Sequence, residues 1–231
     1  CLLLPPNKGS DADFGVLFLH NEGYSTMCGH AIIAIVNLAL KMKWVDIREN
    51  ALETPISIDA PCGNIRAFCR HDTQGKIQGA YFHGVPSFVV GLDLLVNIPN
   101  IGSIKYDLAY GGAFYAYVNA KQLGLELTAE NYSRIIELGK EIKNAVINSS
   151  QPIQHPMEED LSFLYGTIFV SDSSTPGVHS RNVCVFADGE VDRSPTGSGV
   201  SGRLAIHYKR GELDIGETMA VESITGSVFQ G

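Results

Sequence analysis

The stretch Pro195–Ile206, PTGSGVSGRLAI, decides the fold because an earlier stretch, Met27–Val36, MCGHAIIAIV, follows the same plan. In each stretch a tight turn carries a small or nucleophilic residue, a glycine follows, and a largely apolar helix begins. Strand-like sequence precedes both turns. The likeness lies in the architecture and not in a repeated sequence. It predicts two similar α/β units that face each other across a cleft and bring both helix N-termini to one point.

Apolar periodicity and end signals place three helices. The segment Ala31–Leu40 is apolar except for Asn37, which predicts a core helix surrounded by other elements. Val200–Gly211 predicts a second helix, which ends in a Lys-Arg pair before glycine, as helix C-termini often do. A third helix is expected over Ala129–Ile147, with Thr128 as its N-cap.

Short strand-like runs, separated by Gly, Pro, Asn and Asp, fill the stretch Ile56–Val118. Within it, the adjacent glycines of Ala109–Val118, AYGGAFYAYV, indicate either a bent strand or a close approach of the backbone to a ligand or another strand. Two later runs, Leu161–Asp172 and Asn182–Val191, predict further strands. The second of these is expected to fold back at Asp188-Gly189.

The chain length and the net charge limit the classes to which the protein can belong. The 231 residues suffice for two domains of modest size, and we place their boundary between a first unit over 1–98 and a second over 99–231. A formal net charge of −8, without any basic cluster, excludes nucleic acid and anionic membrane surfaces as partners. The longest apolar run, Ala31–Leu40, is too short to span a bilayer.

The cysteines and histidines do not follow the pattern of a disulfide framework or a metal site. The five cysteines are odd in number, and no C-x-x-C pair occurs among them. Of the seven histidines, the six other than His30 also lack metal-ligand spacing. We therefore expect no metal, a reducing compartment (the cytoplasm), and mostly structural thiols with one that is reactive.

Cys28 stands at the start of the first helix, in the sequence Cys28-Gly29-His30. The positive end of a helix and its unpaired N–H groups lower the pKa of a thiol placed there. The N–H groups of Gly29 and His30 could bind a carboxylate at the same point. A base beside an anion cradle suits removal of a proton α to a carboxylate. The alternative is a structural cysteine packed into the core; the adjoining Gly-His pair favours the functional interpretation.

The second turn, Gly197-Ser198-Gly199, offers another anion cradle at a helix start. Together with Gly202 it spells G-x-G-x-x-G, the fingerprint of dinucleotide-binding proteins. That interpretation is disfavoured because the residues before Gly197, Pro195 among them, are not strand-like. Ser198 also lacks the G-x-S-x-G elbow of serine hydrolases. We expect neither a nicotinamide cofactor nor a serine nucleophile.

Thr196 stands at the tip of the loop that leads into this second turn, and Asp192 lies just ahead of it. The Asp192 carboxylate could hold a substrate ammonium or ring N–H, or it could cap the turn or pair with Arg193. A threonine hydroxyl does not ionise near neutral pH, so Thr196 makes a poor acid or base. The turn thus resembles a catalytic loop whose tip does not transfer protons.

Four segments together resemble the proline racemase family: MCGH (27–30), YGGAFYA (110–116), SRNVCVFADGEVDRSPTGSG (180–199) and ESITGSVFQG (222–231). The likeness runs through most of the chain, and the paired MCGH and DRSP-x-G-[ST]-G motifs are highly specific. It implies the diaminopimelate epimerase-like fold, of α/β (α+β) class, with two pseudo-symmetric units that each have β-structure around a central helix. Family members carry further strands on both sides of this span, so we expect flanking strands to be missing at both termini.

The resemblance also implies a reaction. Racemases and epimerases of this family place a cysteine in both turns, and the two thiols exchange a proton between the faces of the substrate. Here Cys28 fills the first place and Thr196 the second. That pairing implies a lyase, which dehydrates trans-3-hydroxy-L-proline to Δ1-pyrroline-2-carboxylate without a cofactor. Elimination needs one base at Cα, whereas racemisation needs a proton donor on the far face. The alternatives are a proline racemase or hydroxyproline 2-epimerase, and a non-catalytic imino-acid-binding homologue.

Each motif residue receives a role from the resemblance. Cys28 accepts the α-proton, Thr196 takes the place of the second catalytic thiol, and Asp192 contacts the ring nitrogen. The substrate carboxylate and ring are held by the residues beside the two turns, namely Gly29, His30, Gly197 and Ser198. The group that protonates the departing hydroxyl stays open among His30, Thr196, a water molecule and the Cys28 thiol. Family members are commonly dimers, so a homodimer is also implied.

Overall fold

In a computed structural model that describes residues 1–47 and 51–231, the chain divides into two compact units, Cys1–Val85 and Pro86–Gly231. Each unit is a mixed β-sheet with at least one helix packed on it, which confirms the α+β class. The division comes earlier than the expected boundary between residues 98 and 99. The reason is strand β7 (Phe88–Ile98), which pairs antiparallel with β8 (Gly102–Tyr110) and so belongs to the sheet of the second unit.

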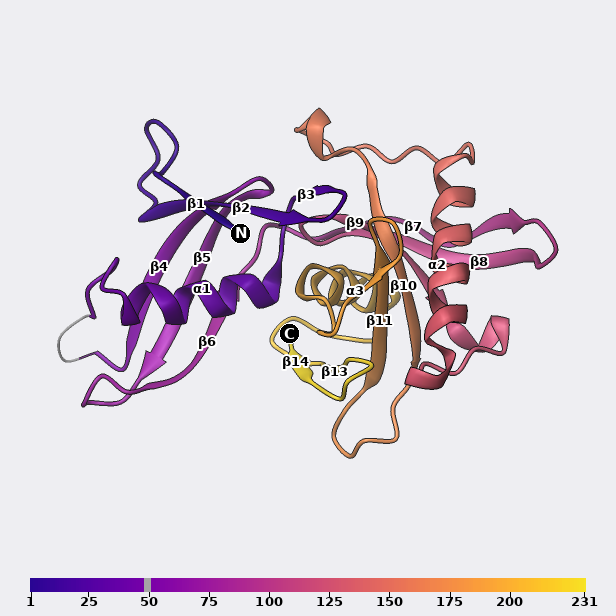
Figure 1. The fold of residues 1–231 in the computed structure, drawn as a ribbon. Coiled ribbons are helices and arrows are strands. Elements are labelled where there is room, and N and C mark those ends of the chain that lie inside the picture. The colour runs from indigo at the N-terminus through magenta and orange to yellow at the C-terminus, as the bar shows by residue number, and fades with distance from the viewer. Residues whose placement is uncertain (48–50) are drawn as a thin grey trace. The chain divides into compact units, whose positions relative to one another are not determined.

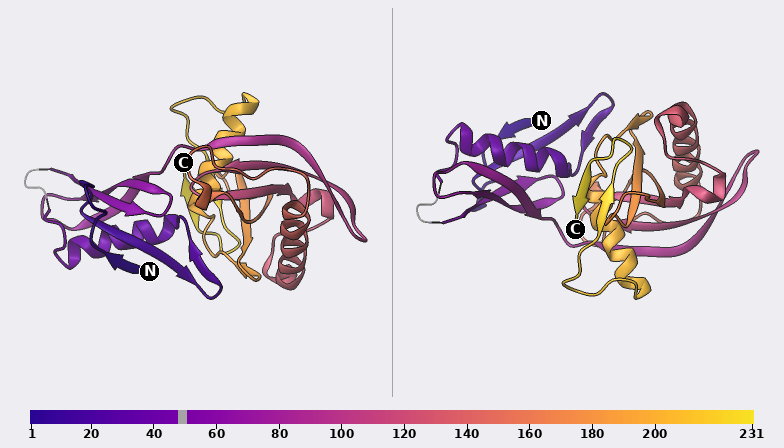
Figure 2. Two further views of the ribbon diagram at one scale, coloured as in Figure 1. Left: turned by 90° about the horizontal axis from the view of Figure 1, so that it is seen from above. Right: turned by 90° about the horizontal axis from the view of Figure 1, so that it is seen from below.

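The first unit has a six-stranded sheet in the order β1-β2-β4-β5-β6, with β3 paired to β2. Among the strands described in this unit, only β2 and β4 pair in parallel, and the crossover between them contains the helix α1 (Gly29–Lys41). Figures 1 and 2 show α1 lying against one face of this sheet. The strands are β1 (Leu2–Leu4), β2 (Phe14–His20), β3 (Gly23–Ser25), β4 (Glu53–Ala60), β5 (Gly63–His71) and β6 (Ile77–His83).

The core of the first unit forms between α1 and one face of its sheet. Side chains alternate along each strand, so every second residue points to the helix; Val16, Ile58 and Ile65 are at most 1% exposed. The matching buried stripe on α1 comprises Ile32, Ile35, Val36, Ala39 and Leu40. The expectation that this helix is surrounded is wrong within its unit, where Leu38 is 44% exposed. The strands of the first unit cover only one side of α1.

The second unit has an eight-stranded sheet in the order β14-β13-β11-β10-β9-β8-β7, with β12 paired to β11. The pairs β9–β10 and β11–β13 are parallel and the others are antiparallel. Besides β7 and β8, its strands are β9 (Phe114–Asn119), β10 (Leu164–Asp172), β11 (Ser180–Phe186), β12 (Glu190–Val191), β13 (Ala220–Glu222) and β14 (Val228–Gln230). Its helices are α2 (Tyr132–Ile147) and α3 (Gly197–Arg210), with 3₁₀ turns at Ala120–Leu123, Ala129–Asn131 and Glu159–Leu161.

The helices α2 and α3 pack on opposite faces of this second sheet (Figure 1). Two neighbouring residues of β10 show the arrangement, because successive side chains on a strand point to opposite faces. Thr167 donates its hydroxyl to the carbonyl of Gly139 on α2, whereas Ile168 lies against Gly199 on α3. The central strands are therefore covered on both sides, and β9 is buried along all but its last residue.

Most of the predicted elements are confirmed. The strand-like runs between residues 56 and 118 correspond to β4 to β9, and Asp188-Gly189 lies in the turn between β11 and β12. The helix expected from Val200 begins earlier, at Gly197, because the glycine-rich turn already has helical backbone. The helix expected from Ala129 begins as a 3₁₀ turn, and Thr128 makes no side-chain cap bond to it. Within the described residues, no helix has the length and apolar content to cross a membrane.

Candidate active site

Cys28 is the N-cap residue of α1, directly after the β3 turn. Its backbone is extended (φ −139°, ψ 97°), and its carbonyl accepts the first helical hydrogen bond, from Ile32 N at 3.0 Å. The N–H groups of the first turn, at Gly29 and His30, have no acceptor inside a helix. The first turn of α1 is fully described and carries no acidic side chain that would compete with a bound anion. The turn therefore presents a half-buried thiol beside a helix N-terminus, the kind of helix end that attracts anions.

His30 contacts the Cys28 thiol through its ring. Nε2 of His30 lies 3.4 Å from Sγ of Cys28, and Nδ1 lies 3.9 Å from it. A ring nitrogen of neutral imidazole accepts a hydrogen bond when it lacks a proton and donates one when it carries a proton, so Nε2 can take the thiol proton in the tautomer that leaves Nε2 unprotonated. This contact places the His30 ring, one of the candidates for protonating the departing hydroxyl, beside the thiol.

The carboxylate of Asp192 is bound by the loop that leads to α3. Its Oδ1 accepts the backbone N–H of Ser194 at 2.8 Å, and its Oδ2 accepts the hydroxyl of Thr196 at 2.9 Å. The alternative that Asp192 caps its own turn is thus confirmed. An ionised carboxylate offers about four lone-pair positions, so these two bonds still allow the carboxylate to accept another donor.

Thr196, the N-cap of α3, has an unusual backbone conformation. Its φ of 67° and ψ of 99° lie in the left-handed half of conformational space, which β-branched residues rarely adopt. Such a conformation costs about 1–3 kcal/mol and persists only where its surroundings impose it. Here the Thr196 hydroxyl donates to Asp192, and its N–H donates to Oγ of Ser194 at 3.1 Å. The side chain is 6% exposed, so its hydroxyl proton is directed at Asp192 inside the loop.

Glycines let the start of α3 approach the sheet closely. A Cβ atom on Gly202 would collide with Oη of Tyr117, and a Cβ atom on Gly111 would collide with the carbonyl oxygen of Ser198. The G-x-G-x-x-G pattern therefore serves helix–sheet packing. The expectation of close backbone approach at the adjacent glycines of the YGGAFYA segment is confirmed, and the approaching element is α3.

Two tyrosines of β9 support the first turn of α3, where an anion cradle is expected, and sequence reasoning missed both. Oη of Tyr115 shares a hydrogen bond with Oγ of Ser198 at 2.8 Å, and Oη of Tyr117 donates to the carbonyl of Gly199 at 2.9 Å. Burial raises the pKa of both phenols well above the usual range, so both stay protonated. Their alternation with alanine in AYGGAFYAYV was the available signal, because it places both rings on the face that meets α3.

The buried cysteines differ from Cys28. Cys184, on β11, is 1% exposed and accepts the N–H of Asp192 at its carbonyl, at a distance of 3.0 Å. Burial, and secondarily the Asp192 charge, raises the pKa of its thiol. Burial also raises the pKa of Cys62 to about 12. These thiols are protonated and structural, as the sequence predicts for most of the cysteines.

The predicted site residues gather at the starts of two helices. The group at α1 in the first unit comprises Cys28, Gly29 and His30. The group at α3 in the second unit comprises Asp192, Thr196, Gly197 and Ser198.

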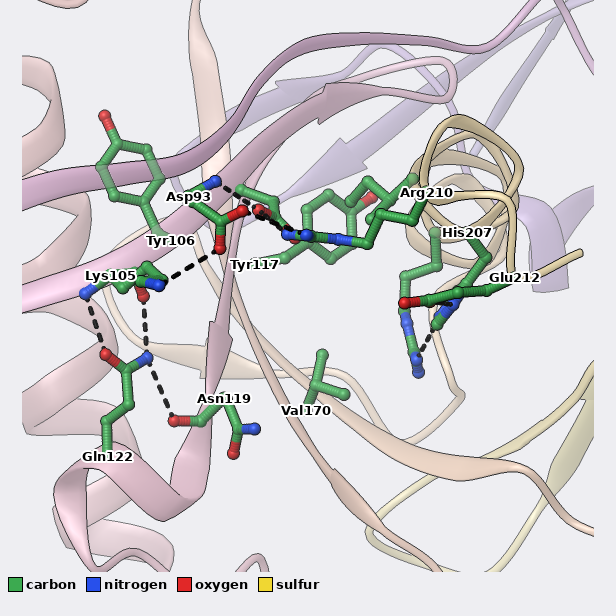
Figure 3. A pocket seen from close by; sticks show the side chains of 13 residues that line it. Asp93, Lys105, Tyr106, Tyr117, Asn119, Gln122, Val170, His207, Arg210 and Glu212 are labelled. Atoms are coloured by element: carbon green, nitrogen blue, oxygen red, sulfur yellow. Dashed lines mark hydrogen bonds and ion pairs between the residues drawn. The ribbon is translucent and has the colours of Figure 1, made fainter.

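A separate hollow of about 310 Å³ in the second unit contains none of these residues (Figure 3). Its charged side chains pair with one another: Arg210 binds Asp93 and Asp107, and Lys105 also approaches Asp93. Across residues 1–47 and 51–231, no group of three His, Cys, Asp or Glu side chains is placed to hold a metal ion.

The family model for proline racemase matches residues 1–231. The chain belongs to the proline racemase family. Its structure agrees with this assignment: the hydroxyproline epimerase of Agrobacterium vitis, solved with bound trans-4-hydroxy-L-proline, matches with a TM-score of 0.90 and 32% identity. That match covers 99% of this chain and 65% of the epimerase, and it confirms the two-unit fold.

Curated members of the proline racemase family include relatives with two different reactions. The trans-3-hydroxy-L-proline dehydratase of Colwellia psychrerythraea is 48% identical over 219 residues, which are 95% of this chain and 61% of the relative. The 3-hydroxyproline 2-epimerase of Burkholderia multivorans is 45% identical over 223 residues, or 96% of this chain and 65% of the relative. The chain thus spans 61–65% of the length of these relatives. Family membership alone does not choose between elimination and epimerisation, so the choice depends on the residues of the two turns.

Proposed function

We propose that the complete polypeptide carrying residues 1–231 is a hydro-lyase that dehydrates trans-3-hydroxy-L-proline to Δ1-pyrroline-2-carboxylate. The observation that carries this proposal is Thr196 at the start of α3. Two-base proton exchange needs a proton carrier at this point, but the Thr196 hydroxyl does not ionise near neutral pH and donates its proton to Asp192. The 48% identity to a relative named trans-3-hydroxy-L-proline dehydratase supports the same reaction.

Each turn contributes a different part of the chemistry. Cys28 removes the α-proton, and Asp192 accepts a hydrogen bond from the ring nitrogen of the imino acid. Negative charge builds on the substrate carboxylate as the proton leaves, and helix N-termini stabilise such charge. The backbone N–H groups that bind the carboxylate and hold the ring belong to Gly29, His30, Gly197 and Ser198.

The stereochemistry of the substrate suits a site that transfers protons from one side. In trans-3-hydroxy-L-proline the hydroxyl is trans to the carboxylate, so the α-hydrogen and the hydroxyl lie on the same face of the ring. A base that removes the α-proton therefore stands on the face from which water departs. Cys28 and His30, with Sγ and Nε2 3.4 Å apart, supply a base and a proton carrier on that face. Among the candidates for protonating the hydroxyl, this pair is favoured and Thr196 is disfavoured.

The proposed elimination is balanced. The Cα–H bond breaks and its proton moves to Sγ of Cys28. The electron pair of that bond forms the Cα=Cβ double bond as the C3–O bond breaks, and the departing hydroxyl takes a proton from the Cys28–His30 pair to leave as water. The enamine then tautomerises to Δ1-pyrroline-2-carboxylate. No electrons are gained or lost overall, so the reaction requires no redox partner.

The direct experiment incubates the complete polypeptide with trans-3-hydroxy-L-proline and detects the pyrroline carboxylate by its reaction with o-aminobenzaldehyde. We expect product from this isomer and none from cis-3-hydroxy-L-proline, whose hydroxyl lies on the face opposite the α-hydrogen. Absence of product from the trans isomer, with a folded protein, would refute the proposed function. Equal turnover of the two isomers would refute the one-sided mechanism.

The second candidate function is that of a 2-epimerase or racemase. The 45% identity to a 3-hydroxyproline 2-epimerase supports it. It is tested with L-proline and trans-4-hydroxy-L-proline in deuterated water. Deuterium at Cα together with a change in optical rotation would favour this function over dehydration. A non-catalytic imino-acid-binding protein is the third possibility, and it would bind these compounds without changing them.

We further propose that the protein acts in the cytoplasm and as a homodimer. All five cysteines are free thiols, which suits a reducing compartment. Cell fractionation tests the compartment. Light scattering on the purified complete polypeptide tests the homodimer, which the resemblance to the family implies.

A further inference from the structure

Arg203, on α3, is a buried cation surrounded by neutral partners. Arg203 is only 4% exposed. Its NH1 group donates to Oγ of Ser180 at 2.5 Å and to Oδ1 of Asn182 at 3.1 Å, and both acceptors lie on β11. None of the ion pairs among the described residues involves Arg203. Neutral buried acceptors around a buried charge indicate that the guanidinium serves to orient the groups it binds.

Arg203 fixes the orientation of the Asn182 side-chain amide. A guanidinium can only donate, so the atom of Asn182 that faces it must be the carbonyl oxygen. The NH₂ group of Asn182 is then directed away from Arg203, and it donates to the carbonyl oxygen of Pro195 at 3.2 Å. Asn182 is fully buried, so no solvent competes for these bonds. A continuous chain of hydrogen bonds therefore links Arg203 to the peptide between Pro195 and Thr196.

A second contact holds the other terminal nitrogen of the guanidinium. NH2 of Arg203 lies 2.8 Å from Nε2 of His207, one turn further along α3. Because Arg203 can only donate, Nε2 must accept, and the ring proton resides on Nδ1. That proton is donated to Oε2 of Glu212 at 2.7 Å, near the surface (Figure 3). The guanidinium is thus bound between the acceptors of β11 and a histidine of its own helix.

We propose that Arg203 is a positioning residue of the active site, which acts through Asn182 to hold the Pro195–Thr196 peptide. The part of this proposal that concerns catalysis rests on the proposed function. Thr196 has a left-handed backbone that its surroundings must impose, and the Pro195 carbonyl is the acceptor group next to it. Rotation of that peptide would move the Thr196 hydroxyl away from Asp192 and tilt the first N–H groups of α3. Asn182 therefore preserves the geometry of both the carboxylate and the anion cradle.

The decisive variant is Asn182→Asp. An aspartate keeps an acceptor for Arg203 and neutralises its charge, but it has no N–H group to donate to Pro195. The matched control is Ser180→Ala, which removes the other Arg203 acceptor on the same strand and leaves the bond to Pro195 intact. Asn182→Ala serves as a second variant should the aspartate fail to fold, because it removes the same donor without adding a charge.

Hydrogen–deuterium exchange of the peptide covering residues 192–200 gives a readout that does not depend on turnover. We expect faster exchange in this peptide for Asn182→Asp and Asn182→Ala than for the wild type, and wild-type exchange for Ser180→Ala. Equal exchange in all four proteins, at comparable thermal stability, would overturn the proposal. If the wild type does not dehydrate trans-3-hydroxy-L-proline, the proposed function fails while this measurement still decides the positioning role.

Steady-state kinetics with trans-3-hydroxy-L-proline supply the catalytic readout. Misplacement of supporting groups lowers activity by about 10- to 100-fold, so we expect kcat/KM to fall by that factor for both Asn182 variants. For Ser180→Ala we expect less than about a threefold change in kcat/KM, because loss of the Ser180 hydroxyl leaves the bond from Asn182 to Pro195 in place. A Ser180→Ala variant as impaired as Asn182→Asp, at comparable stability, would contradict a path that runs through Asn182.

Discussion

The hydroxyl of Thr196 and the carboxylate of Asp192 form a hydrogen bond of 2.9 Å, from Oγ1 to Oδ2, across the loop that begins α3. The second oxygen of Asp192 accepts the N–H of Ser194, so the loop residues themselves fix the carboxylate. The threonine thereby orients the group proposed to bind the ring nitrogen. This arrangement explains why a residue without acid or base strength is useful at the position where a second thiol would act in epimerisation.

Thr196→Cys should convert part of the activity to proton exchange. A thiol at this position introduces a proton carrier on the second face of the substrate and removes the hydroxyl donor to Asp192. We expect deuterium at Cα with inversion of trans-4-hydroxy-L-proline in deuterated water, and slower dehydration of trans-3-hydroxy-L-proline. Thr196→Ser is the control, since it keeps the hydroxyl and should not invert either compound. The assay needs a reductant because the side chain of residue 196 contacts the Cys184 thiol.

Exchange without inversion in the Thr196→Cys variant would show that the new thiol does not reach the second face. The one-sided interpretation of the wild-type site would then lose its main support.

Cys28→Ser should abolish dehydration. The serine hydroxyl keeps the size of the side chain but is a much weaker base, and general acid–base groups contribute about 10²- to 10⁴-fold to rate. Cys62→Ala is the matched control, because Cys62 is also followed by glycine but is buried and has a raised pKa. We expect this control to lower thermal stability and leave kcat nearly unchanged. Wild-type turnover by Cys28→Ser would remove the thiol from the mechanism.

The sequence predicted the secondary-structure elements well where the signal lies in neighbouring residues, as in turn residues and in the alternation of apolar and polar side chains along a strand. The turn at Asp188-Gly189 and the strands between residues 56 and 118 are examples. The unit boundary was misplaced because the strand-like sequence of β7 does not indicate which sheet the strand joins. Only its pairing with β8 assigns it to the second unit. The single-sided burial of α1 was likewise not visible, since an apolar helix does not reveal how many elements cover it.

The candidate site was predictable only in its local part. Cys28 and Thr196 could be singled out because each sits at a helix start, a property of the adjacent sequence. The supporting residues could not, because their contacts depend on tertiary placement. Ser198 meets Tyr115 across 83 positions of sequence, and Arg203 meets Asn182 across 21. Nothing in the sequence around Asn182 indicates that its amide binds the loop before α3.

The contact between Arg203 and His207 predicts sensitivity to acid. Burial, and secondarily the Arg203 charge, lowers the pKa of His207 below its ordinary value of 6.5. The His207 side chain therefore takes up a proton near pH 6.5 in the unfolded chain, but only at lower pH in the folded protein. Its contribution to stability is fully present above pH 6.5 and is lost as the pH falls below this value. The other groups around the ring are Glu212, which raises the pKa, and His179, whose own pKa is lowered by burial.

His207→Gln isolates this effect, because glutamine accepts from Arg203 and does not titrate. We expect urea unfolding midpoints measured between pH 8 and pH 5 to fall more steeply for the wild type than for His207→Gln. Parallel curves for the two proteins would show that His207 does not contribute to the acid sensitivity.

Gly202→Ala should destabilise the second unit by overpacking. The new methyl group would collide with Oη of Tyr117, which donates to the carbonyl of Gly199 in the first turn of α3. Overpacking of this kind costs about 1–3 kcal/mol, and the measurement is the change in the free energy of unfolding. Gly79→Ala is the control, because a Cβ atom there meets nothing within 4 Å.

The double variant Gly202→Ala/Tyr117→Phe tests the cause of that loss. Removal of Oη relieves the closest collision, although Cζ of residue 117 still lies 3.1 Å from the added Cβ position. The double variant should therefore be more stable than the sum of the two single changes predicts, because the two substitutions share one contact. Strict additivity would show that the helix moves away from the sheet as a whole. In that case dehydration should fall with stability, since the first turn of α3 carries the proposed anion cradle.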